Sequence, residues 1–297
     1  MENINEAVVN TGTRHSYYKH SGAFSPMGPI IILVLGTIGT TILSLIYSYA
    51  IYYIPFVYLN FLIAIGFGFG AGFIVGMGGK LGKVRNTSIM TLFGVIIGLF
   101  AQYAQWVFWI FAYSKQQLLF TNPVDIFAIM KLLAVEGVWS IRSFTPTGAF
   151  LYVIWFLEAV IIIGTSTITA RTLLNDSAFC EKCNIWVDNK EFIDPLDYVN
   201  DSEELRNQLE QGNFSALSLL KKAELGSNQY TTVELLSCKD CKDFYLVTVK
   251  SVMISKNSKG EEKKDEKVIV ENLIIDSRVY NSIKLWSNSI KETISSL

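Results

Sequence analysis

The sequence predicts a bundle of four transmembrane helices followed by a small α+β domain, and two observations support this fold class. The chain of 297 residues is 51% hydrophobic and 17% charged, with a mean hydropathy of +0.34, whereas a soluble domain usually has about 25% charged residues. Residues 1–170 hold eight basic and five acidic side chains (+3), and residues 171–297 hold seventeen and twenty-one (−4). Such a break at one point in the chain indicates two environments, a bilayer and water.

Four apolar segments are long enough to cross a membrane, which requires about 20 helical residues for roughly 30 Å of hydrocarbon. Three of them contain no charged residue and the fourth contains one, Glu158. We expect transmembrane helices over residues 28–51, 55–78, 88–113 and 148–169, within a membrane domain of residues 28–170.

A shorter segment, residues 122–136, lies between the third and fourth spans. Asn122 is a candidate helix cap and Pro123 occupies the first helical position. Because the segment is too short and too charged to span, we expect an interfacial helix on or in the outer leaflet. A helix packed on the mouth of the bundle is an equal alternative.

The loop after the second span predicts the orientation. Residues 79–87 have three basic side chains and no acidic one; these are Lys80, Lys83 and Arg85. Basic loops stay on the cytoplasmic side, which places the N-terminal tail, residues 1–27, and the domain of residues 171–297 in the cytoplasm. The outer loop, residues 114–147, also has three basic residues. The three side chains of the inner loop either bind anionic lipid headgroups or only determine the topology.

All four cysteines follow residue 179 and form two CxxC pairs, Cys180 with Cys183 and Cys238 with Cys241. Two such turns supply the four thiolates that structural zinc prefers. The pattern resembles a zinc ribbon, which implies a structural Zn²⁺ and a zinc-ribbon-like fold for residues 171–297. Fifty-four residues separate the pairs, against about 15–20 in compact sites, so the fold must bring them together. A redox dithiol, an iron–sulfur cluster and disulfides are alternatives.

The rest of this cytosolic domain has mixed signals. Short helices are expected over residues 201–211 and 214–224, strands over 230–237, 244–254 and 268–275, and a solvated loop over 256–267. A helix from about Ser277 carries an apolar stripe formed by Ile283, Trp286, Ile290, Ile294 and Leu297.

Small residues form ridges on the second and third spans. The ridge residues are Gly66, Gly68, Gly70, Gly72 and Gly76, followed by Gly94 and Gly98. Such ridges let helix backbones approach closely in lipid. They predict either packing within one four-helix bundle or self-association of subunits through the second span.

Glu158 is the only acidic residue in a predicted span. A charge near the middle of a bilayer costs several kcal/mol, so we expect Glu158 to face the bundle or a water-filled cavity, with Gln102 and Gln105 of the third span as partners. It is a candidate proton or cation site, or one member of a pore-lining ring. The alternative is a glutamate that only locks helix packing.

Catalytic motifs are absent from the sequence, and both histidines, His15 and His20, lie in the N-terminal tail, where we expect them to be solvated. The acidic balance argues against nucleic acid as a partner. We therefore expect a non-enzymatic membrane module that contacts membrane lipid, forms homo-oligomers through its glycine-rich helices and docks a cytosolic protein through the zinc domain. An oligomeric pore or small transporter that uses Glu158 is one alternative, and a membrane thiol oxidoreductase is another.

Overall fold

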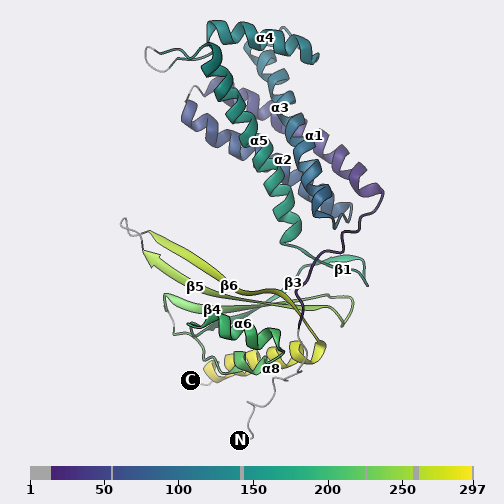
Figure 1. The fold of residues 1–297 in the computed structure, drawn as a ribbon, viewed down its shortest axis with the longest axis vertical. Helices are drawn as coiled ribbons and strands as arrows, with labels where there is room; N and C mark the ends of the chain where they lie inside the picture. The colour runs from purple at the N-terminus through teal and green to yellow at the C-terminus, as the bar shows by residue number, and fades with distance from the viewer. Residues whose placement is uncertain (1–14, 55, 141–143, 225, 257–260, 296–297) are drawn as a thin grey trace, which may run out of the picture. The chain divides into compact units, whose positions relative to one another are not determined.

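The computed structural model consists of two compact units (Figure 1), Met1–Lys19 with Ala178–Leu297 and His20–Ser177. It describes every residue except 1–14, 55, 141–143, 225, 257–260 and 296–297. The N-terminal unit is helical and the C-terminal unit is rich in strands, as expected.

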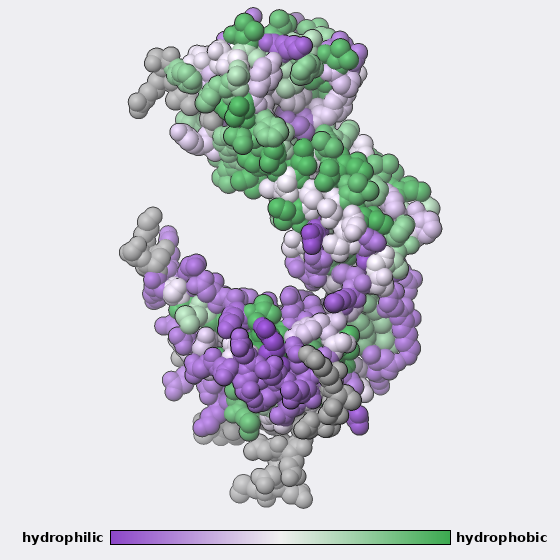
Figure 2. Space-filling model, in the orientation of Figure 1, coloured by the Kyte–Doolittle hydropathy of each residue, from purple (hydrophilic) through white to green (hydrophobic). Residues whose placement is uncertain are grey.

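Five helices form the unit of residues 20–177. They are α1 (Met27–Tyr53), α2 (Val57–Leu81), α3 (Thr87–Tyr113), α4 (Pro123–Glu136) and α5 (Gly148–Asn175). By length and composition, α1, α2, α3 and α5 could each cross a membrane, which confirms the four long apolar helices. On the face shown in Figure 2, the surface of this unit is mainly apolar, whereas that of the other unit is mainly polar.

Glycines allow α5 to lie directly against α2 and α3. A Cβ atom on Gly68 would be 2.6 Å from the carbonyl oxygen of Ile162, and one on Gly98 would be 2.9 Å from the Cα of Ile163. The same close approach to α5 occurs at Gly72, Gly76 and Gly94, whereas a Cβ on Gly70 would meet Leu43 of α1. Among the described residues, no atom lies within 4 Å of the Cβ position of Gly66. Most of the predicted ridge positions therefore pack within the chain.

Helix α4 packs on the end of the helical unit. The side chain of Asn122 accepts a hydrogen bond from the backbone N–H of Val124 (2.9 Å), and Pro123 starts the helix. Ile126 and Leu133 are buried against a cluster that includes Trp106. Packing on the mouth of the bundle is therefore observed. The other side of α4 carries an exposed apolar row, which is the surface that an interfacial helix requires. This row is formed by Val124, Phe127, Leu132 and Val135.

The strand-rich unit contains two antiparallel sheets. A hairpin pairs β1 (Ala178–Cys180) with β2 (Ile185–Val187). The larger sheet has the order β3 (Asn189–Leu196), β4 (Gln229–Ser237), β5 (Tyr245–Lys256) and β6 (Glu262–Ile275). Strand β3 was not expected, and β5 and β6 continue through most of the described residues predicted to be a solvated loop. The helices of this unit are α6 (Ser202–Glu210), α7 (Ser215–Ser218) and α8 (Ser277–Ser295).

Helices α6 and α8 cover one face of this sheet (Figure 1). Ile283 and Trp286 of α8 are 0% and 8% exposed, and they pack in the same core as Val233 and Val247 of the sheet. The expectation that α8 exposes its apolar stripe to a partner is therefore wrong at these two positions, because the sheet itself covers them. The side chains of Ile290, Ile294 and Leu297 lie outside the described residues.

Residues 15–18 lie along β6 rather than in a free tail. The backbone N–H of Tyr18 donates to the carbonyl of Asn272 (2.8 Å), and that of Ile274 donates to the carbonyl of Ser16 (2.9 Å). His15 Nδ1 is 2.7 Å from the carbonyl oxygen of Ile274. In the helical unit, His20 Nε2 is 3.0 Å from the carbonyl oxygen of Leu174. The expectation that both histidines are simply solvated is therefore wrong.

Candidate metal centre and aromatic cavity

The first cysteine pair lies at the β1–β2 hairpin. Cys180 ends β1, and Cys183 lies in the turn before β2. Asn184 follows with a φ of 56°, a left-handed conformation that asparagine adopts more readily than most residues. Phe179 and Trp186 pair across the hairpin with their rings edge to face, 5.0 Å between centroids. This local geometry turns both sulfurs toward the same side.

The second pair lies in the loop that joins β4 to β5. Ser237 ends β4 and Tyr245 begins β5, so Cys238 and Cys241 both belong to this connection. The backbone N–H of Cys238 donates to the carbonyl of Phe244 (3.1 Å), which closes the loop. The two pairs, far apart in sequence, are brought together because β4 runs antiparallel to β3, so that Ser237 at the end of β4 pairs with Asn189 at the start of β3.

The four sulfur atoms form one compact cluster. All four Sγ atoms lie within 4.8 Å of one another, and those of Cys180 and Cys241 are 3.5 Å apart. Four Zn–S bonds of 2.3 Å in a tetrahedron separate the sulfurs by about 3.8 Å. All four residues are free cysteines. The prediction that the fold joins the two pairs is confirmed, and the cluster could hold one metal ion.

The surroundings of the cluster are apolar on the inside and charged on the outside. Cys180 is 1% exposed and packs with Leu236 and Leu246, and burial raises the pKa of its thiol and that of Cys183. Two ion pairs tie the cysteine loops together across the surface; these are Lys182 with Asp243, and Lys239 with Asp188 at 3.0 Å. The hydrogen bond to Asp243 raises the pKa of Lys182, and the one from Lys239 lowers the pKa of Asp188.

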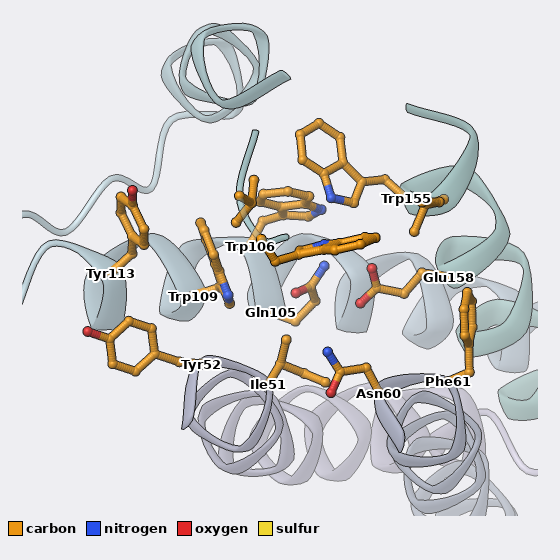
Figure 3. Close-up of a pocket in the computed structure, with 13 residues that line it drawn as sticks. Ile51, Tyr52, Asn60, Phe61, Gln105, Trp106, Trp109, Tyr113, Trp155 and Glu158 are labelled. Carbon is orange, nitrogen blue, oxygen red and sulfur yellow. The ribbon is translucent and has the colours of Figure 1, made fainter. Parts of the chain in front are cut away.

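A second candidate site is a cavity of about 200 Å³ in the helical unit (Figure 3). It lies near the C-terminal ends of α1 and α3 and the N-terminal ends of α2 and α5. Its walls include four indole rings, those of Trp106, Trp109, Trp139 and Trp155. Its hydrophilic lining includes Asn60, Gln105 and Glu158, and Glu158 is the only charged group among the described residues that line it. The cavity is therefore aromatic, with one acidic group.

Tyr47 of α1 holds the Glu158 carboxylate. Its hydroxyl donates to Glu158 Oε1 at 2.5 Å, and its ring stacks on Phe67 at 4.5 Å. Gln102 and Gln105 were the predicted partners of Glu158. That prediction is wrong, because the hydrogen bond to Glu158 comes from Tyr47. Tyr47 was not predicted as a partner, because in the sequence it is only one of four tyrosines near the end of the first span, with Tyr49, Tyr52 and Tyr53. No described residue donates a hydrogen bond to the second oxygen, Glu158 Oε2.

Gln105 lines the cavity and carries a buried, unpaired donor. The residue is 4% exposed, and its Nε2 makes no hydrogen bond within the described part of the chain. Figure 3 shows its amide and the carboxylate of Glu158 turned toward each other. Its backbone carbonyl accepts from the hydroxyl of Ser48 (2.8 Å), which fixes α3 against α1. Gln102 Oε1 is also unpaired, but Gln102 is not among the lining residues.

Asn60 presents an acceptor on the same side. The side-chain amide of Asn60 finds hydrogen-bond partners for both its nitrogen and its oxygen when the two atoms are exchanged relative to Figure 3. In that orientation the nitrogen donates to the carbonyl oxygens of Ile54 (3.1 Å) and Phe56 (3.2 Å). The amide oxygen then takes the position on the cavity side that the nitrogen has in Figure 3.

The basic loop lies at the opposite end of the helical unit. Lys80 is in the last turn of α2, where a cation complements the helix dipole, and Lys83 has a φ of 51°. The backbone N–H of Arg85 donates to the carbonyl of Ala23 (2.9 Å). Helix α3 runs from this loop to the cavity, and the stretch from Thr87 to the first lining residue, Gln105, is about 27 Å long. Lipid binding by these side chains stays a prediction.

Comparisons with family models, with curated proteins and with solved structures found no match to the chain. Function is therefore inferred from the chemistry of the two sites.

Proposed function

We propose that the chain is a multi-pass membrane protein with α1, α2, α3 and α5 across the bilayer and α4 at the outer interface. The outward apolar surface of these helices supports this proposal, because soluble proteins rarely expose apolar patches of this extent. The basic α2–α3 loop favours a cytoplasmic location for the strand-rich domain and an outer location for the cavity. Retention in the membrane fraction after alkaline carbonate extraction tests insertion, and protease accessibility of residues 178–297 in sealed vesicles tests orientation.

The metal is proposed to be a structural Zn²⁺. Four thiolates complete a tetrahedral shell and leave no position open for a substrate. A redox dithiol normally lies at the start of a helix, whereas both pairs here lie in turns between strands. Elemental analysis of the purified full chain should find one zinc per chain. Reactive thiols without zinc, or iron in its place, would instead support the thiol oxidoreductase or the iron–sulfur alternative.

The function that the geometry supports best is non-enzymatic binding of a small ligand within the membrane unit, as a receptor or small transporter. The observation that supports it is the aromatic cavity with a carboxylate and an unpaired buried amide. Native proteins satisfy nearly all buried polar groups, so we expect a ligand atom or an ordered water molecule to pair with Gln105. Self-association and docking of a cytosolic protein stay predictions. Most of the ridge glycines and both described residues of the α8 stripe pack inside the chain, so they give these two predictions no support.

Reconstitution into liposomes separates the transporter from the receptor. With a potential imposed across the membrane, a transporter or pore moves protons or small cations, and Glu158→Gln reduces the flux at least tenfold. Glu136→Gln is the matched control, because Glu136 is exposed at the end of α4 and is not part of the cavity. Liposomes that stay tight across a range of pH and voltage would exclude transport and leave the receptor.

A further inference from the structure

We propose that the cavity around Glu158 binds a small organic ammonium cation that also carries an oxygen atom. This inference rests on the proposed ligand-binding role of the membrane unit and names the chemical class of the ligand. The evidence comes from the charge of the lining, the nature of its walls, its volume and the unpaired donor of Gln105.

The charge of the lining favours a cation. Among the described residues that line the cavity, Glu158 is the only ionisable acid or base other than tyrosine, and none of them is Lys, Arg or His. The hydrogen bond from Tyr47 occupies Oε1 and leaves Oε2 toward the cavity without a donor. An unpaired carboxylate in a medium of low dielectric constant is costly. A ligand cation that contacts Oε2 would remove this cost.

The walls favour an organic cation over a metal ion. Indole is the best of the aromatic rings for cation–π contacts, and aromatic cages are the usual recognition site for quaternary ammonium groups. The rings of Trp106 and Trp155 meet edge to face (87°), with 4.9 Å between centroids, and both line the cavity. A hard metal ion needs about six oxygen ligands, whereas this lining offers one carboxylate and two side-chain amides besides its aromatic and aliphatic groups.

The volume and the amide groups limit the rest of the ligand. The volume of about 200 Å³ lies below the roughly 300–1,000 Å³ of pockets for drug-sized ligands, so the ligand is small. Gln105 Nε2 is a buried donor without an acceptor, and an oxygen on the ligand would supply one. Choline has these three features, a compact quaternary nitrogen, a short chain and a hydroxyl oxygen, and it is therefore the probe.

The first experiment compares choline with its neutral isostere. Full-length protein in dodecyl maltoside is titrated with choline chloride and, separately, with 3,3-dimethylbutan-1-ol, while tryptophan fluorescence is followed at constant ionic strength. We expect a saturable change with choline and binding at least about tenfold weaker for the neutral isostere, which has the same shape without the charge. Equal binding of the two, or no saturable change with choline, would overturn the proposal without affecting membrane insertion or the zinc site.

Variants then locate the site. Glu158→Gln keeps an acceptor for Tyr47 but removes the charge, and it should weaken choline binding at least about tenfold, because the attraction between opposite charges is stronger near a protein interior than in bulk water. Trp155→Phe should weaken binding several-fold, whereas Glu136→Gln should leave it unchanged. Full choline affinity in both Glu158→Gln and Trp155→Phe would refute the location even if the wild type binds.

The source of the cation is resolved in nanodiscs. A choline group could come from a free solute or from a lipid headgroup that enters from the outer leaflet. If headgroups occupy the cavity, choline affinity in phosphatidylcholine nanodiscs should be at least tenfold lower than in phosphatidylglycerol nanodiscs. Equal affinity in the two assigns the site to a free solute.

Discussion

Replacement of Gly72 by alanine tests the role of the glycine ridge within the chain. Gly72 lies on α2 where this helix touches α5, and an added Cβ would meet the backbone carbonyl of Ser166 and lie 2.8 Å from the Cβ of Thr169. Gly66, less than two turns earlier on α2, is the matched control, because no described atom lies within 4 Å of its Cβ position. The two substitutions add the same methyl group to the same helix.

The expected difference follows from these distances. Carbon atoms pack best at about 3.5–4.0 Å, so the methyl group of Gly72→Ala requires α5 to move by about 1 Å. Such overpacking costs about 1–3 kcal/mol, partly offset by the helix propensity of alanine, worth up to about 1 kcal/mol. Gly66→Ala gains the helix propensity of alanine without the cost of overpacking. The two variants should differ by about 2 kcal/mol, or about 4–8 °C in melting temperature for a unit of this size.

The assay is the loss of the monodisperse peak in size-exclusion chromatography after heating in detergent. We expect Gly72→Ala to melt below the wild type and Gly66→Ala at or above it. Particle mass from light scattering tests the other hypothesis. If Gly66 contacts a second copy of the chain, Gly66→Ala changes the mass. A Gly72→Ala protein as stable as the wild type would show that α2 and α5 do not pack as the structure has them.

Three further predictions concern the strand-rich unit. Zinc chelation or Cys183→Ser should speed amide hydrogen exchange in β1 and β2 while the amides of β4 and β5 that pair at the core of the sheet stay protected; uniform loss of protection would contradict this. Ile283→Ala should lower the free energy of unfolding by about 2–5 kcal/mol because the side chain is buried, whereas Leu285→Ala, at a position 67% exposed, should change it by less than about 0.5 kcal/mol in denaturant titrations. Burial and the hydrogen bond to Glu210 raise the pKa of Tyr17 from 10 to about 12, so its stabilising contribution is intact below pH 10 and is lost as the pH rises through 12. The melting temperature of the wild type should therefore fall more steeply over this interval than that of Tyr17→Phe, and identical slopes would refute the assignment.

The long helices could be predicted because their signal is local. An uncharged run of more than 20 residues specifies a long apolar helix without knowledge of its neighbours. The signal of the paired cysteines is also local, because CxxC spacing specifies a turn. Two such pairs predict that the four thiols gather at one site. Strand β3 was missed because Pro195 and several charged residues interrupt it, as an edge strand permits.

Contacts between helices could not be predicted in the same way. The Tyr47–Glu158 hydrogen bond depends on how α1 and α5 are rotated about their axes, and the glycine contacts of α5 help to determine that rotation. For α8, the apolar stripe at Ile283 and Trp286 was predicted correctly, but the surface that covers it was not. Its apolar face could meet a partner or the domain's own sheet, and only the fold decides between them.

The position of the cysteine cluster explains why a zinc ion bound there would hold a hairpin rather than fold the whole unit. The larger core of the strand-rich unit does not include the cysteines, which belong to a smaller cluster with Ala178, Val187, Leu236 and Leu246. Strands β1 and β2 have three residues each and form a sheet separate from the other four strands, and an isolated hairpin of this length is not stable in water. Four metal–sulfur bonds would therefore supply most of the attachment of the hairpin to the β4–β5 loop. Since the chain passes from α5 to β1 through only two residues, 176 and 177, loss of the metal would loosen the first segment after the last long apolar helix and leave both larger cores intact.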